Sequence, residues 1–283
     1  MMVERADAHI HLFDQGFQEE FTARPGVDIN ELACFESLAT DHQVTAALVV
    51  GYGAQEWCRD NNRFLADKLA QYAWIHALAF VSSPEELTVA QLEIWRGQGF
   101  VGISIYLFDD GFASFLRQRP REVWKWLVAN RWLISVNSQG EYWDAWAPVL
   151  EQHGALRVVI SHLGLPPAVH QPPSDRATRQ ALAGPLAMAR SPGPRVKLSG
   201  FYALTAPGHD YPHEAAWPYV DCLRAAFGVD RLLWGSDYPP YLDSLSYPQT
   251  FGMFGKMPFF SAGDCEQIEG GNLHSLLAEI DRD

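Results

Sequence analysis

Residues 5–14 read RADAHIHLFD, and this stretch is the key to the fold because it predicts a strand that runs into a loop. Successive side chains of a strand point to opposite faces, so Asp7, His9 and His11 would share one face. Two imidazoles that project into the same space beside a carboxylate can be hydrogen-bonded structural histidines or part of a functional site. The rest of the sequence has to distinguish these two interpretations.

Short apolar runs of the same kind recur along the chain and alternate with longer helical patterns. The predicted strands span 5–11, 45–51, 74–80, 100–108, 132–138, 156–162, 195–200 and 231–237. The helical patterns include 62–72, 84–99, 121–130, 141–154, 178–190 and 215–228. This alternation indicates parallel strands joined by crossover helices. Eight strands in 283 residues predict an α/β fold, a (β/α)8 TIM barrel, as a single domain over residues 1–283.

A doubly wound open sheet is the alternative fold. It would place a G-x-G-x-x-G phosphate turn after the first strand, and residues 9–16, HIHLFDQG, do not contain one. The proline-rich residues 163–175 are too few for a linker between domains and predict a long loop after the sixth strand. We find no internal repeat or low-complexity tract, which favours one barrel.

The composition narrows the class of partner. The formal net charge of -13 argues against nucleic acid and anionic membranes, because an acidic surface repels phosphate groups. The N-terminus is charged where a signal peptide would be apolar, and no run is long enough to span a bilayer. The four cysteines show no C-x-x-C spacing, which argues against a cysteine zinc site or a disulfide scaffold: Cys34, Cys58, Cys222 and Cys265. We expect a cytoplasmic protein with a small-molecule substrate, and a homo-oligomer stays open.

Polar residues at the ends of the predicted strands are the candidates for catalysis, because barrel active sites lie at the C-terminal ends of the strands. His9 and His11 end the first strand, His162 ends the sixth and Asp237 ends the eighth. Polar groups with a purely structural role are usually scattered, so they would not be expected to converge at one mouth of the barrel. The pattern therefore predicts a catalytic site.

Two roles suit these four residues. His9, His11 and Asp237 could hold a divalent metal ion, with zinc as the first choice, which would acidify a bound water. Without a metal, Asp237 would act as general base toward water while the histidines hydrogen-bond a carbonyl oxygen. Both versions predict attack by water. The chain has no G-x-S-x-G motif and no cysteine at a strand end, so covalent catalysis has little support.

Four segments carry a resemblance to a known family: DAHIHLFD at 7–14, VVISHLGLPP at 158–167, VKLSG at 196–200 and RLLWGSDYP at 231–239. In this order and spacing they resemble the amidohydrolase-2 branch of the amidohydrolase superfamily, and most closely its sugar-lactonase and pyrone-dicarboxylate-lactonase-like group. The resemblance implies a barrel hydrolase. It places His9, His11 and Asp237 around the reactive water and His162 opposite the substrate carbonyl.

The sequence departs from this family pattern at two strands. Metal-dependent relatives usually have a histidine at the end of the fifth strand, where this chain has Asn137 and Ser138. This weakens the case for a metal, and Asn137 or Gln139 could instead hydrogen-bond the substrate. Relatives that bind acidic lactones often carry arginine on the fourth strand, where this chain offers Ser104. A neutral sugar lactone is therefore favoured over a dicarboxylate.

Three further groups of residues are candidates for contact with the substrate. Lys197 in the seventh strand would either contact the substrate or form a salt bridge inside the barrel. Tyr238, beside Asp237, is predicted to stack on a sugar ring. Tyr202 could line the rim of the pocket, whereas His213 in the same loop is expected to be solvated.

The sequence thus predicts a hydrolase that opens a lactone, with a sugar lactone as the favoured substrate. The alternatives are a metal-dependent amidohydrolase or a nonoxidative decarboxylase of the same superfamily. A binding protein without chemistry is a third possibility, disfavoured because a complete acid–base set is not needed for binding alone. The cofactor is either one divalent metal ion or none.

Overall fold

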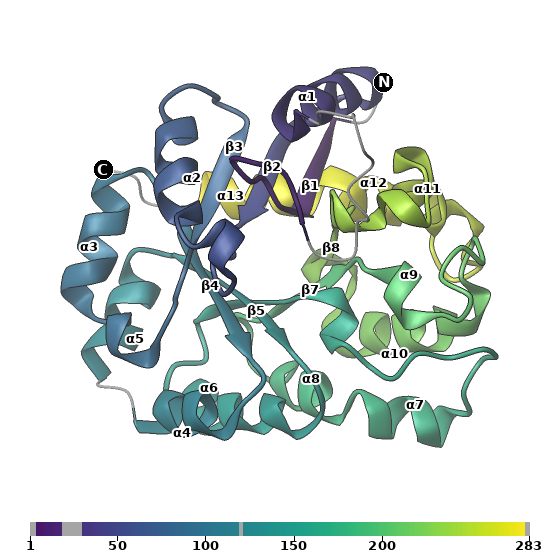
Figure 1. Cartoon of the computed structure of the whole chain (residues 1–283). Helices are drawn as coiled ribbons and strands as arrows, with labels where there is room; N and C mark the ends of the chain where they lie inside the picture. The colour runs from purple at the N-terminus through teal and green to yellow at the C-terminus, as the bar shows by residue number, and fades with distance from the viewer. Residues whose placement is uncertain (1–3, 19–29, 119–120, 281–283) are drawn as a thin grey trace.

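The computed structural model describes residues 4–18, 30–118 and 121–280. Its eight strands form one parallel sheet in which each strand pairs with the next along the chain, in the order β1 to β8. With helices around this ring of strands, the predicted single-domain (β/α)8 TIM barrel is confirmed (Figure 1). The strands are β1 Arg5–Ile10, β2 Val44–Val50, β3 Ile75–Phe80, β4 Gly102–Leu107, β5 Leu133–Ser138, β6 Arg157–Ile160, β7 Arg195–Leu198 and β8 Leu232–Trp234.

Helices cover the outside of the barrel. They are α1 Glu31–His42, α2 Asn61–Leu69, α3 Val89–Gly97, α4 Asp110–Gln118, α5 Arg121–Ala129, α6 Ala147–Gln152, α7 Asp175–Ala181, α8 Ala183–Met188, α9 Phe201–Leu204, α10 Trp217–Phe227, α11 Tyr247–Gly252, α12 Ala262–Glu266 and α13 Asn272–Ala278. None of the helices in the described ranges combines the length and the apolar character that crossing a bilayer requires.

The strands are apolar on both faces, because one face fills the inside of the barrel and the other packs under the helices. In β5, for example, Leu133, Ile134 and Val136 are all completely buried. Parallel strands in this position read as nearly continuous apolar runs, so the sequence reveals where they lie. All eight predicted strands are confirmed, and their observed bounds differ from the predicted ones by a few residues at most.

The helix predicted over 178–190 is two helices. α7 ends at Ala181 and α8 begins at Ala183, and Leu182 between them has φ -101° and ψ 13°. Pro185 explains the break, because a proline has no N–H to donate to the carbonyl four residues earlier, which belongs to Ala181.

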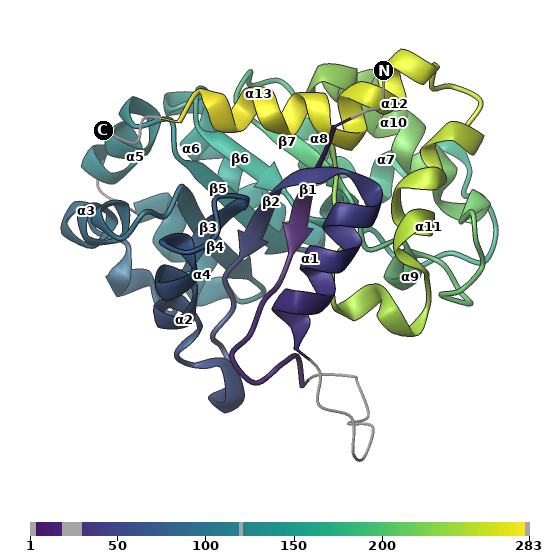
Figure 2. The same cartoon turned by 90° about the horizontal axis from the view of Figure 1, so that it is seen from above.

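The C-terminal segment packs against the start of the first strand. Figure 2 shows α13 across the end of the barrel at which β1 begins. Gly270, in the π-helical turn Gln267–Gly271 that precedes α13, lies so close that a Cβ atom there would be 2.3 Å from the carbonyl oxygen of Glu4. Glycine is therefore required for this approach. The opposite end of the barrel, where the strands finish, carries the polar residues.

The barrel closes where β1 meets the segment after β8. The backbone N–H of Asp237 donates to the carbonyl of His9 over 2.8 Å, and the N–H of His11 donates to the carbonyl of Tyr238 over 2.6 Å. Below them, Oδ1 of the buried Asp7 accepts the backbone N–H groups of His9 and Ser236 at 3.1 and 2.9 Å. One carboxylate oxygen thus joins the first strand to the last.

We predict that Asp7→Ala lowers the free energy of unfolding by about 2–6 kcal/mol, because it leaves two buried N–H groups without an acceptor, at roughly 1–3 kcal/mol each. Asp7→Asn keeps an oxygen at the same place and should cost much less. Denaturant unfolding of both variants measures the difference. Equal losses in the two variants would show that Asp7 does not act through its acceptor oxygen.

Asp7→Asn and the unsubstituted protein together test how stability depends on pH. Burial raises the pKa of Asp7 from 3.8 to about 7. The folded protein then binds this proton more tightly than the unfolded chain, so the stability that it contributes is complete below about pH 4 and is lost as the pH rises through about 7. Asp7→Asn cannot titrate and should flatten this part of the stability profile.

Candidate active site

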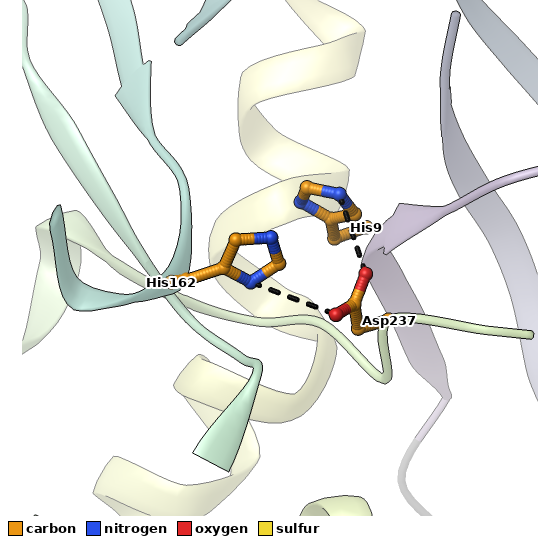
Figure 3. A group of neighbouring side chains, drawn as sticks. All are labelled: His9, His162 and Asp237. Atoms are coloured by element: carbon orange, nitrogen blue, oxygen red, sulfur yellow. Dashed lines mark ion pairs between the residues drawn. The ribbon is translucent and has the colours of Figure 1, made fainter. Parts of the chain in front are cut away.

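Four side chains from three places in the chain meet at the C-terminal mouth of the barrel. His9 lies near the end of β1, His11 just after it, His162 directly after Ser161 at the end of β6, and Asp237 in the loop after β8. Nε2 of His9 lies 3.6 Å from Oδ1 of Asp237, and Nδ1 of His162 lies 3.8 Å from its Oδ2 (Figure 3). Nε2 of His11 lies 3.8 Å from Oδ1 of Asp237. The structure therefore brings together the four residues that the sequence singles out, and their catalytic roles stay predictions.

Two of these residues are held in an unusual backbone conformation. Asp237 has φ 64° and His162 has φ 50°, both in the left-handed region that residues other than glycine rarely adopt. Such a residue costs on the order of 1–3 kcal/mol and persists only where its surroundings fix it. The N–H of Asp237 is fixed by the carbonyl of His9, and the carbonyl of His162 by the N–H of Leu165 at 2.8 Å. Both side chains line the cavity at the mouth of the barrel.

The histidines are neutral because they are buried. Burial lowers the pKa of His11 to about 4 and holds the pKa of His9 well below its ordinary value of 6.5. Burial also lowers the pKa of His162, against the attraction of Asp237, which raises it. At neutral pH each ring therefore offers one N–H donor and one acceptor nitrogen.

Lys197 lies beneath the imidazoles, inside the barrel, and it is completely buried. Its Nζ donates to Oγ of Ser135 over 2.7 Å and lies 3.3 Å from Nδ1 of His9. Burial lowers the pKa of Lys197 to about 7. Lys197 is not among the described residues that line the cavity above these side chains, and its contact with the substrate stays a prediction. Its hydrogen-bond partners are a hydroxyl and an imidazole rather than a carboxylate.

Two contacts that the sequence did not predict hold the catalytic candidates in place. The hydroxyl of Tyr202 donates to Oδ2 of Asp237 over 2.6 Å, and Oγ of Ser199 lies 2.9 Å from Nδ1 of His162. Tyr202 was expected only at the rim of the pocket. Ser199 and Tyr202 both lie in the segment 196–202, VKLSGFY, which runs through the end of the seventh strand. Their position at the end of a strand is the sequence signal from which these contacts could have been expected.

A cavity of about 340 Å³ opens above these side chains. It is lined by Phe13, Phe17, Tyr52, Tyr106, Phe108, Leu165, Gly200, Tyr202, Ala203 and Pro240, together with His11, Asn137, His162 and Asp237. Oδ1 of Asn137 is buried and has no hydrogen-bond partner among the described residues. Asn137 therefore lies at the cavity with an acceptor atom available, and its contact with the substrate stays a prediction.

Two expectations about neighbouring loops are wrong. Tyr238 is completely buried, its hydroxyl donates to the carbonyl of Glu31 over 3.0 Å, and its ring packs 5.4 Å from that of Phe35. It therefore cannot stack on a sugar. His213 is not solvated: it is completely buried, with Nδ1 2.7 Å from Oγ1 of Thr205. The left-handed turn at Asp237 sends the following side chain into the core, which residue order alone does not reveal.

A metal ion fits this site in ligand type and spacing. Among the described residues, His9, His162 and Asp237 each offer a ligand atom, and these atoms all lie within 4.8 Å of one another. His11 is also close, and its Nδ1 lies 2.7 Å from the carbonyl of Val50, the kind of acceptor that usually orients a metal-binding histidine. Behind His9, however, stands Nζ of Lys197, which is a donor.

Comparison with known proteins gives a family and a fold. The sequence profile of the family described as amidohydrolase matches residues 6–272. No curated protein matches the chain. Among solved structures, an amidohydrolase from Burkholderia multivorans with bound zinc has a TM-score of 0.75 at 21% identity, over 97% of this chain and 99% of that chain.

Two other solved structures with the same fold are described with different activities. A protein from Acinetobacter baumannii, described as a probable 2-pyrone-4,6-dicarboxylic acid hydrolase with citric acid bound, has a TM-score of 0.70 at 21% identity, over 97% of this chain and 99% of that chain. A 2,6-dihydroxybenzoate decarboxylase complexed with 2,6-dihydroxybenzoate has a TM-score of 0.64 at 15% identity, over 98% of each chain. At these identities the likeness establishes the fold alone.

We predict that Gly200→Ala displaces the ring of His162. Gly200 has φ 68°, and a Cβ atom there would lie 2.6 Å from Nδ1 of His162. The left-handed conformation alone should lower the free energy of unfolding by roughly 1–2 kcal/mol. Denaturant unfolding and a crystal structure of the variant measure both effects.

Gly255→Ala is the matched control, because a Cβ atom at Gly255 would meet nothing within 4 Å and its φ is ordinary. We expect its stability and the position of His162 to be those of the unsubstituted protein. An unmoved His162 ring in Gly200→Ala would contradict the prediction.

Proposed function

The chain belongs to the amidohydrolase family, and from this premise we propose that it is a hydrolase that opens an uncharged lactone, with a sugar lactone as the favoured substrate. The observation that carries the proposal is the meeting of Asp237 with three neutral imidazoles, of which His11 and His162 line a cavity together with Asp237. This set contains a carboxylate that can accept a proton and N–H groups that can stabilise an oxyanion.

The proposed reaction needs no covalent intermediate with the protein. Asp237 would accept a proton from a water molecule while the water oxygen bonds to the lactone carbonyl carbon. An N–H of His162 would donate to the carbonyl oxygen as it gains negative charge. The ring C–O bond then breaks, and the protonated Asp237 returns its proton to the alkoxide that leaves. The product is an open-chain hydroxy acid.

Tyr202 supports the role of Asp237. Its hydroxyl donates to Oδ2 over 2.6 Å, which leaves Oδ1 directed toward the imidazole pair and fixes the carboxylate plane. A base that is already oriented loses little conformational entropy when the substrate reacts.

An amidohydrolase of the same fold has bound zinc, and zinc is the ion that these ligand types favour. His9, His11 and Asp237, or His9, His162 and Asp237, would hold it. When bound, the ion would lower the pKa of a water molecule and so supply the nucleophile. Asp237 and Tyr202 keep the same places in either version.

The cavity supports an uncharged ring as the substrate. Among the described residues that line it there is no lysine or arginine, and six are phenylalanine or tyrosine: Phe13, Phe17, Tyr52, Tyr106, Phe108 and Tyr202. Ser104 of β4 is buried, with no hydrogen-bond partner among the described residues, and supplies no positive charge. A carboxylate would enter without a partner, which is costly in such a site, whereas a sugar or similar ring can pack on aromatic faces.

The same observation argues against the decarboxylase alternative. A nonoxidative decarboxylase must bind a carboxylate as the group that it removes. To bind this carboxylate, the described lining offers at most a site for a metal ion, and it offers no side-chain cation. We therefore keep the lactonase as the leading proposal and the metal-dependent amidohydrolase as its alternative.

We predict that Asp237→Asn lowers kcat for lactone hydrolysis by about 10²–10⁴-fold, since a general base contributes a factor of this size. Tyr202→Phe, which keeps the base but loses one hydrogen bond to it, should cost roughly tenfold, the effect of about 1.4 kcal/mol. Proton release from a panel of lactones, with metal-free and with zinc-loaded protein, provides the measurement. Absence of turnover with every lactone under both conditions would refute the proposed function.

We also predict a preference among substrates. An uncharged lactone should exceed its carboxylate-bearing analogue in kcat/KM by roughly tenfold or more, because a missing charge-assisted hydrogen bond is worth about 1.5–3 kcal/mol. Phe108→Arg places a cation in the lining and should reduce this preference.

Ile94→Arg is the control, since it adds the same charge on an exposed surface of α3. It should leave the preference unchanged. Faster hydrolysis of the carboxylated analogue by the unsubstituted protein would contradict the assignment of an uncharged substrate.

A further inference from the structure

The position of one proton can be worked out from the hydrogen bonds of His11. Its Nδ1 lies 2.7 Å from the carbonyl oxygen of Val50, and a carbonyl can only accept. Nδ1 of His11 therefore carries the hydrogen. His11 is buried, where a charged ring would lose its solvation, and a neutral ring with its hydrogen on Nδ1 has a bare acceptor at Nε2.

His9 must then donate from Nε2. Its Nε2 lies 3.2 Å from Nε2 of His11, within hydrogen-bond distance. Two bare nitrogens at this separation would repel each other, and His11 has no hydrogen to offer there. The hydrogen between them therefore belongs to His9, and Nδ1 of His9 is the bare nitrogen.

The opposite side of the same ring leads independently to the same tautomer. Nζ of Lys197 lies 3.3 Å from Nδ1 of His9 and 2.7 Å from Oγ of Ser135. An ammonium group has three hydrogens and no lone pair, so it can only donate, and its hydrogen bond to His9 then ends on a bare Nδ1. All three side chains are buried, so water does not compete for these contacts.

We propose that Lys197 is a positioning residue that donates to Nδ1 of His9 and thereby keeps the ring proton on Nε2, facing Asp237. His9 then donates to Nε2 of His11 at 3.2 Å, and Oδ1 of Asp237 lies 3.6 Å from the same Nε2. The assignment goes beyond the proposed hydrolysis and does not depend on the substrate.

This tautomer opposes zinc binding at His9. A zinc-bound histidine uses a bare nitrogen, and its other nitrogen donates to an acceptor behind it. His9 has the reverse arrangement: the hydrogen is on the nitrogen nearest Asp237, and a donor stands behind the ring. Binding of zinc through Nε2 would require the proton to move to Nδ1, where it would point at Nζ of Lys197. Lys197 should therefore weaken the affinity for zinc.

The first test is ¹⁵N NMR of the metal-free protein, with the ring signals of His9 assigned by their loss in His9→Gln. We expect Nε2 to show the chemical shift of a protonated ring nitrogen and Nδ1 that of a bare one. A protonated Nδ1 would overturn the proposal. This readout needs no substrate, so the proposal can fail while the lactonase proposal stands, and the reverse is equally visible.

The second test is the affinity for the zinc ion, measured by calorimetry on three proteins. Lys197→Met should bind zinc about tenfold or more tightly than the unsubstituted protein, the size of effect that such outer-sphere partners have. Ser135→Ala removes the other partner of Lys197 but leaves its contact with His9, and should stay within about twofold of the unsubstituted protein.

Equal zinc affinity in Lys197→Met and the unsubstituted protein would overturn the effect assigned to Lys197. Removing the positive charge of Lys197 also raises the affinity for a cation. The NMR result separates this charge effect from the tautomer effect, because the charge effect does not depend on which nitrogen of His9 is protonated. If Lys197→Met does not fold, Lys197→Gln replaces it, and the NMR test on the unsubstituted protein decides in any case.

Discussion

The closure of the barrel between its first and last strands is the constraint on which the site depends. The backbone hydrogen bonds that join the two ends involve His9, His11 and Asp237, the same residues whose side chains form the site. Asp7 locks the seam from below through one carboxylate oxygen. The distance between the proposed base and the imidazole pair is therefore set by the sheet itself, and a change that opened the seam would dismantle the site together with the fold.

Burial then decides how these groups behave. Three imidazoles, a lysine and a carboxylate lie together with little water, so the histidines stay neutral and the lysine has a lowered pKa. Neutral rings can donate on one side and accept on the other, which allows hydrogen bonds to run from Lys197 through His9 to His11 and on to the carbonyl of Val50. Charged rings would repel one another and break this order.

The fold and the meeting of the four site residues could be predicted because they follow from periodicity and from one rule of barrel architecture. Buried parallel strands are visible as apolar runs, and a polar residue at the end of each run must lie at the mouth. The directions of Tyr238 and His213 could not be predicted, because they depend on local backbone turns. The depth of Lys197 was also hidden, since a lysine within a strand gives no sign of whether it ends at the mouth or below it.

The absence of cations among the described residues around the cavity has a consequence for the end of the reaction cycle. Opening an uncharged lactone creates an anion where there was none, next to Asp237 and within a chain whose formal net charge is -13. Under the proposed reaction the newly formed hydroxy acid is repelled by the surroundings that accepted its precursor. Under this proposal, electrostatic repulsion favours release of the product from the cavity.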